Sequence, residues 1–284
     1  MNANGRARPG HFAGAGYQTT GAGVAGAADV RKVPVWRTFV LTFRDVSTVL
    51  YAMPLKVLIA AVIQALTMIA LSYFGGSDPA VRNWPLEIVV TVICTFGTLP
   101  YAIAIYRLIL LGEIVPGYVF DIRDPRLMAL FQYSILLMIP VWIVWWLGLS
   151  ILGLTVGEGF AVTMLVSLIV GTASVLLFPA IAIDRPMTLL KAAFALKGNY
   201  LRVAFLAIAI FVSVPAAVFL VLVIISIVLV PVMGQKELQD AFTLLNVPLT
   251  ILIVFVLQTL FVILGAHLLL MLDRPEIPWS QRRA

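Results

Sequence analysis

Long apolar runs separated by short polar segments make up most of this chain. Almost uncharged runs extend over 54–74, 86–111, 127–152, 160–183, 201–231 and 244–272, each bounded by Gly, Pro or charged residues. About twenty apolar residues in a helix are enough to cross the hydrocarbon core of a bilayer, which is roughly 30 Å thick. The pattern therefore predicts an all-α fold, a polytopic membrane helix bundle with about six transmembrane helices.

An amphipathic pattern precedes the first run. Within 35–50, aromatic residues such as Trp36 and Phe39 fall three or four positions apart, while Arg37 and Arg44 fall between them. A helix with this pattern is too polar to span a membrane, so we expect it to lie at the surface with its arginines facing anionic phospholipids. The alternative is that it packs against the helix bundle.

A second amphipathic segment lies between the fourth and fifth runs. Residues 187–199 predict a short helix in which Leu190 and Phe194 face lipid or the bundle. Lys191 and Lys197 then lie near phosphate headgroups. The fold therefore includes two interfacial helices beside the predicted spans.

Composition agrees with a membrane as the main solvent. Apolar residues make up 62% of the chain and charged residues 11%, whereas soluble domains have about 45–50% and about 25%. The single cysteine, Cys94, excludes an intramolecular disulfide and a cysteine-based metal cluster.

The basic residues are distributed unevenly between the two predicted sides of the membrane. Of the 19 Lys and Arg, all but Arg82 and Lys236 lie on one side. This asymmetry follows the positive-inside rule, so the net charge of +6 indicates topology and not a nucleic-acid partner. We therefore predict a multi-pass protein with both termini in the cytoplasm.

Three regions follow from this organisation. Residues 1–34 are rich in Gly and Ala and are expected to form a flexible cytoplasmic tail. Residues 35–275 form the transmembrane domain, and 276–284 form a basic C-terminal tail.

Candidate polar positions are few. Arg107, Glu113 and Asp121 belong to the most polar long stretch between spans, for which a self-neutralised, solvated loop is the alternative. Gln258 and His267 lie in the last run, where hydrogen bonding within the bundle is the simplest role. The chain has no Walker A sequence, dinucleotide fingerprint, zincin motif or Gly-x-Ser-x-Gly elbow. We predict no cofactor, metal or catalytic site.

One stretch resembles a known family. Phe178-Pro179-Ala180-Ile-Ala-Ile-Asp184 and the segment Leu190–Val203 resemble the YciC-like membrane proteins and the membrane domain attached to some glycerophosphoryl diester phosphodiesterases. The resemblance implies a bacterial inner-membrane helix bundle of the predicted size. It implies no catalytic residues.

The function that these features favour is non-enzymatic. We predict an integral inner-membrane protein that acts through lateral contacts with lipids, with another membrane protein or with a second copy. The alternative is a small-solute permease or permease subunit, in which Gln64, Gln258, His267, Pro140 and Pro215 line one cavity. An intramembrane enzyme would require Glu113, Asp121 or His267 to converge on a common pocket.

Overall fold

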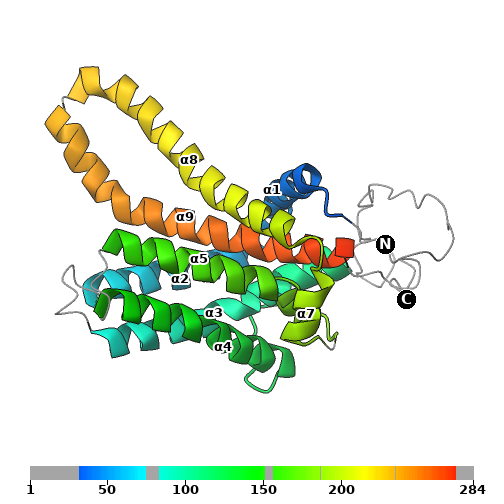
Figure 1. Cartoon of the computed structure of the whole chain (residues 1–284). Helices are drawn as coiled ribbons and strands as arrows, with labels where there is room; N and C mark the ends of the chain where they lie inside the picture. Colours follow the sequence, from blue (N-terminus) through cyan, green and yellow to red (C-terminus); the bar gives the residue numbers. More distant parts are fainter. Residues whose placement is uncertain (1–31, 75–82, 151–155, 186, 234, 273–284) are drawn as a thin grey trace, which may run out of the picture. The chain divides into compact units, whose positions relative to one another are not determined.

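The chain divides into two units, Met1–Val30 and Arg31–Ala284. The computed structural model describes residues 32–74, 83–150, 156–185, 187–233 and 235–272, all of which belong to the second unit (Figure 1). The predicted C-terminal tail 276–284 lies outside the described residues. The same holds for residues 1–31 of the predicted N-terminal tail 1–34.

The described part of the chain is all-helical, as predicted. Its nine helices are α1 (Val35–Ala52), α2 (Pro54–Phe74), α3 (Trp84–Leu111), α4 (Pro125–Ser150), α5 (Val156–Ser174), α6 (Leu177–Ala182), α7 (Leu189–Ala195), α8 (Tyr200–Met233) and α9 (Gln235–Leu272). Five of them, α2, α3, α4, α8 and α9, are long and apolar enough to cross a membrane. The chain is therefore a multi-pass membrane protein.

The predicted span 160–183 is not one continuous helix. It is divided into α5 and α6 by a turn at Val175 and Leu176. In an unbroken helix, the carbonyl of Val175 would accept a hydrogen bond from the amide of residue 179. That residue is Pro179, which has no amide hydrogen, so the helix is interrupted one turn before the proline.

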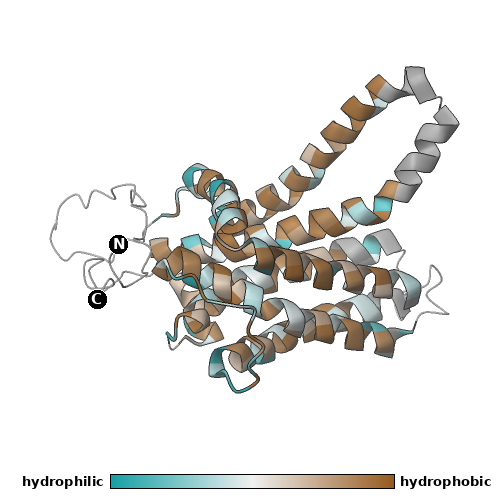
Figure 2. Cartoon of the chain, turned by 180° about the vertical axis from the view of Figure 1, so that it is seen from behind, coloured by the Kyte–Doolittle hydropathy of each residue, from teal (hydrophilic) through white to brown (hydrophobic). Residues whose placement is uncertain are grey.

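α3 and α9 occupy the centre of the bundle. α9 packs against α1, α2, α3, α6 and α8, and α3 also packs against α2, α4 and α6. Their facing sides supply fully buried residues such as Ile105, Leu260 and Leu264. The outward sides of the long helices remain apolar and exposed, and hydrophilic residues gather toward the helix ends (Figure 2). This distribution fits a protein surrounded by lipid.

α1 confirms the predicted helix at 35–50 and shows which of its faces is buried. Thr38, Thr42 and Val49 face the bundle, and both threonine hydroxyls donate to backbone carbonyls one turn earlier. The aromatic face is turned outward, and Trp36 is 75% exposed. α1 therefore packs on the bundle through Thr38, Thr42 and Val49, with Phe39 half-buried against the core, and leaves Trp36 exposed.

α7 is shorter than the predicted helix 187–199. The Thr188 hydroxyl caps its start by accepting from the Lys191 amide, and the helix ends at Ala195. Gly198 has a φ of 82°, a left-handed conformation that continues no helix. Asn199 then accepts a hydrogen bond from the Val33 amide at 2.8 Å, so the chain beyond α7 is used to hold the segment that leads into α1.

Candidate functional site

The segment between α3 and α4 folds back along α3. We call residues 112–124 the return segment. It starts at Gly112, whose φ of 69° ends α3 in a left-handed cap. The Tyr118 hydroxyl donates to the Gly97 carbonyl at 2.8 Å. Gly97 lies roughly 20 Å along α3 from the helix end at Leu111. Most residues of the return segment are exposed, as in the solvated-loop alternative, but Tyr118 attaches the segment to the side of α3.

Aromatic contacts hold the return segment between α3 and α4. The ring centroids of Phe120 and Phe96 are 6.1 Å apart, and those of Phe96 and Phe131 are 5.1 Å apart. Tyr118 packs against Phe120 at 5.2 Å. Each of these distances lies within the range of favourable aromatic pairs. The segment is thus fixed at its middle and not only at its ends.

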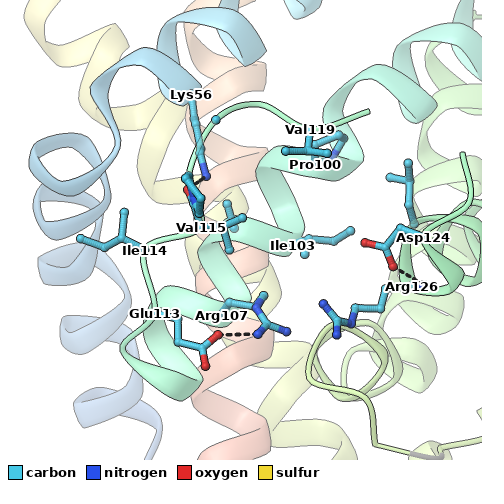
Figure 3. A pocket seen from close by; sticks show the side chains of 14 residues that line it. Lys56, Pro100, Ile103, Arg107, Glu113, Ile114, Val115, Val119, Asp124 and Arg126 are labelled. Atoms are coloured by element: carbon cyan, nitrogen blue, oxygen red, sulfur yellow. Dashed lines mark hydrogen bonds and ion pairs between the residues drawn. The ribbon is translucent and has the colours of Figure 1, made fainter. Parts of the chain in front are cut away.

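A cavity of about 450 Å³ lies beside the return segment (Figure 3). Its lining comes from α2, α3, α4 and the return segment: Lys56, Pro100, Ile103, Ala104, Arg107, Glu113, Ile114, Val115, Pro116, Gly117, Val119, Asp124, Arg126 and Leu127.

Three cationic side chains reach this cavity from three different helices. Lys56 of α2 is 7% exposed, and its ammonium group donates to the Val115 carbonyl of the return segment. Arg107 of α3 forms an ion pair with Glu113 and donates to the Ala182 carbonyl at 3.4 Å. Arg126 of α4 completes the set.

Asp184 links the two arginines from just outside the cavity lining. Its carboxylate accepts from Arg126 Nε at 2.6 Å and lies 4.0 Å from Arg107. Asp184 has a φ of 61°, which Asp tolerates better than most residues. The cluster therefore has three cations and, with Glu113 and Asp124, three carboxylates.

The residues that the sequence singled out in this stretch lie in different places. Arg107 and Glu113 lie together as ion-pair partners, but Asp121 is exposed, and its side chain accepts from the backbone amide of Arg123. Lys56 also lines the cavity, although a lysine near the start of a span ordinarily extends to the interface by snorkelling.

A second polar contact joins α1 to α9. His267 Nε2 lies 3.1 Å from Asp45 Oδ2, and the two side chains are 8% and 17% exposed. The ring nitrogen lacks the alignment of a good hydrogen bond, so we regard the contact as electrostatic. Burial acts to raise the pKa of Asp45, but His267 and Arg44 outweigh it, and the pKa lies below its usual value.

The candidate residues on α9 do not join the cavity. Neither Gln258 nor His267 lines it, and the same holds for Gln64, Pro140 and Pro215. The buried Gln64 instead faces Cys94, whose sulfur is 3.7 Å from the Gln64 oxygen. Glu113, Asp121 and His267 likewise have different partners. Glu113 pairs with Arg107, Asp121 accepts from the Arg123 amide, and His267 lies beside Asp45.

The predicted lipid-contact residues lie on the surface. Arg37 and Arg44 of α1 are exposed, as are Lys191 of α7 and Lys197 beyond its end. Among the described residues, no group of three or more His, Cys, Asp or Glu is placed to hold a metal ion.

Comparison with known protein families, curated proteins and solved structures gives no match. The fold and the site thus define a multi-pass helical membrane protein with a charged cavity. The resemblance of 178–203 to the YciC-like proteins stays a prediction.

Proposed function

We propose that this chain is a non-enzymatic protein of the bacterial inner membrane that binds anionic phospholipid through one end of its bundle. This end, which we call the charged end, holds α1, α7, the return segment and the cavity. The bilayer is then both the solvent and the partner of the protein. Contact with another membrane protein or with a second copy is the competing use of the same surface.

The orientation of α1 carries the proposal. Its threonine face is buried, so Trp36 and Phe43 are free to enter the bilayer while Arg37 and Arg44 remain exposed. Aromatic and basic residues on one exposed surface helix are typical of interfacial binding.

Three contacts fix α1 in this rotation. The Val33 amide donates to Asn199, and the Thr38 hydroxyl contacts the Met271 sulfur at 3.3 Å. The third is the Asp45–His267 pair. An outward aromatic face is therefore a fixed property of the packed protein.

α7 repeats this arrangement on a smaller scale. Ala192 is buried, while Leu190 and Phe194 are 67% and 66% exposed. Lys191 and Lys197 lie beside them and are exposed. Side chains this exposed contribute little to packing within the bundle, which favours lipid contact over the packing role.

The proposed topology has six crossings with both termini in the cytoplasm. α5 and α6 together form a broken fourth crossing, since a helix may be interrupted in a membrane where protein buries the break. The high density of Lys and Arg at the charged end supports its placement on the cytoplasmic side.

A small-solute permease is the weaker reading. Its expected polar and proline positions do not line the observed cavity, and His267 is already occupied by Asp45.

The experiment measures retention of anionic lipid after purification in mild detergent. Replacing Arg37, Arg44, Lys191 and Lys197 by Gln removes four charges worth about 1 kcal/mol each near an anionic surface, so retention should fall markedly. Lys236→Gln removes one of the two basic residues predicted to lie on the opposite side of the membrane and is the control. Unchanged retention in the fourfold variant would refute the proposal. The packing account predicts instead that Phe39→Ala and Phe194→Ala lower thermal stability while the charge changes are silent.

A further inference from the structure

We propose that the cavity binds the phosphate of one anionic lipid headgroup, and that Glu113 occupies the phosphate position on Arg107 while no lipid is bound. The inference rests on the proposed lipid function and assigns a discrete site to it. It concerns residues that are separate from the basic side chains of α1 and α7.

Three cations line the cavity together with Glu113 and Asp124, so an anion can bind Arg107 only in place of Glu113. Arg107 and Arg126 point toward one another across the cavity, with Lys56 on a third side (Figure 3). Arg107 is only 16% exposed, so its guanidinium group is largely withdrawn from water. A planar guanidinium donates two parallel hydrogen bonds to a phosphate, and an ammonium group adds a point charge.

Glu113 is the carboxylate that a ligand can replace. Its side chain is 51% exposed and belongs to the non-helical return segment, and the one ion pair found for it is with Arg107. Asp184, in contrast, is held by Arg126 and lies near Arg107 as well. Rotation of Glu113 into solvent leaves Arg107 available while Asp184 keeps both arginines in place.

The surroundings favour a lipid over a soluble phosphate compound. The cavity wall includes Ile103, Val119 and Leu127, and its volume suits a headgroup better than a whole lipid. On the return segment, Ile114, Val119 and Ile122 are 61%, 56% and 67% exposed. Acyl chains can therefore leave the cavity along this exposed apolar surface.

The test measures saturable binding of short-chain phosphatidylglycerol to the purified full-length protein in a zwitterionic detergent, followed by native mass spectrometry. Glu113→Gln removes the internal competitor and should tighten binding about tenfold. Arg107→Gln should abolish saturable binding. Asp121→Asn removes a carboxylate of the same segment that faces no cation of the cavity, and it should bind as the unmodified chain does.

The outcomes separate this inference from the proposed function. If Glu113→Gln and Arg107→Gln both bind as the unmodified chain does, while the fourfold change on α1 and α7 lowers lipid retention, the site is refuted and the surface function stands. Arg107→Gln could lose binding because it misfolds. In that case the tighter binding expected for Glu113→Gln still tests the site independently. Equal affinity for glycerol 3-phosphate and for the lipid would refute a lipid headgroup as the ligand.

Discussion

The contact between Asp45 and His267 should stabilise the docked position of α1. Asp45→Asn removes the carboxylate charge and His267→Gln removes the imidazole ring, and the double variant removes both. The two atoms lie 3.1 Å apart, and neither side chain is more than 17% exposed. Each single change is expected to destabilise the protein, and the double change to cost less than the sum of the two.

The expected loss of stability follows from how deeply the Asp45–His267 pair is buried. For a protonated His267, the Coulomb attraction at 3.1 Å is about 5 kcal/mol at an effective dielectric constant of about 20. Desolvation offsets most of it. Exposed pairs contribute about 0–1 kcal/mol, and breaking a buried pair costs about 3–5 kcal/mol. Because Asp45 is partly exposed, we expect about 2 kcal/mol for Asp45→Asn, or roughly 4–8 °C in Tm.

The chain contains its own reporter for this measurement. Cys94 is the single cysteine and is buried, so a fluorogenic thiol reagent reacts with it only as the bundle opens. Thermal unfolding in detergent can be followed through this reaction without a label. A change in Tm below about 1 °C for both single variants would refute a stabilising pair.

The stabilisation that Asp45 contributes should decrease at low pH. The pKa of Asp45 is lowered from the usual 3.8, so its carboxylate contributes fully above that pH and loses its contribution as pH falls through the folded-state pKa. The difference in Tm between the unmodified chain and Asp45→Asn should persist from pH 7 to 5 and shrink below about pH 4. A difference that disappears by pH 5 would contradict the assigned pKa direction.

Two further predictions concern packing and topology. Gly265→Leu should lower Tm and cost about 1–3 kcal/mol, because a Cβ there would lie 3.1 Å from the Val175 carbonyl oxygen; Gly171→Leu, where nothing lies within 4 Å of the added Cβ, should be neutral. After replacement of Cys94 by Ala, a cysteine at Asn83 should react with an impermeant thiol reagent in intact cells and one at Asp121 should not. Labelling at Asp121 alone would reverse the proposed orientation.

The helices of this fold could be predicted from the sequence because their signal is local. An apolar run long enough to span a bilayer specifies a helix without reference to any partner. The break between α5 and α6 was missed although Pro179 is visible, because transmembrane helices often tolerate proline. What the sequence does not show is that Gly265 lets α9 approach the carbonyl of Val175 at the break.

The candidate site could be predicted only where its contacts are local. Arg107 and Glu113 are close in sequence, so a self-neutralised pair could be expected from the sequence. Asp184 lies far from Arg126 along the chain, and only the packing of α6 beside α4 brings them together. The attachment of the return segment to α3 could not be predicted, because the hydrogen bond from Tyr118 to Gly97 depends on tertiary structure.

The central position of α9 determines when the protein can become stable during synthesis. α9 supplies the packing surface for α1, α2, α3, α6 and α8, yet it is made after all of them. Roughly 160 residues separate the end of α3 from the end of α9, which corresponds to about 10–30 s of translation at 5–20 residues per second. During that interval α3 lacks one of its packing partners, and Asp45 lacks its contact with His267. The helices that pack on α9 therefore reach their full packing only after α9 has been made.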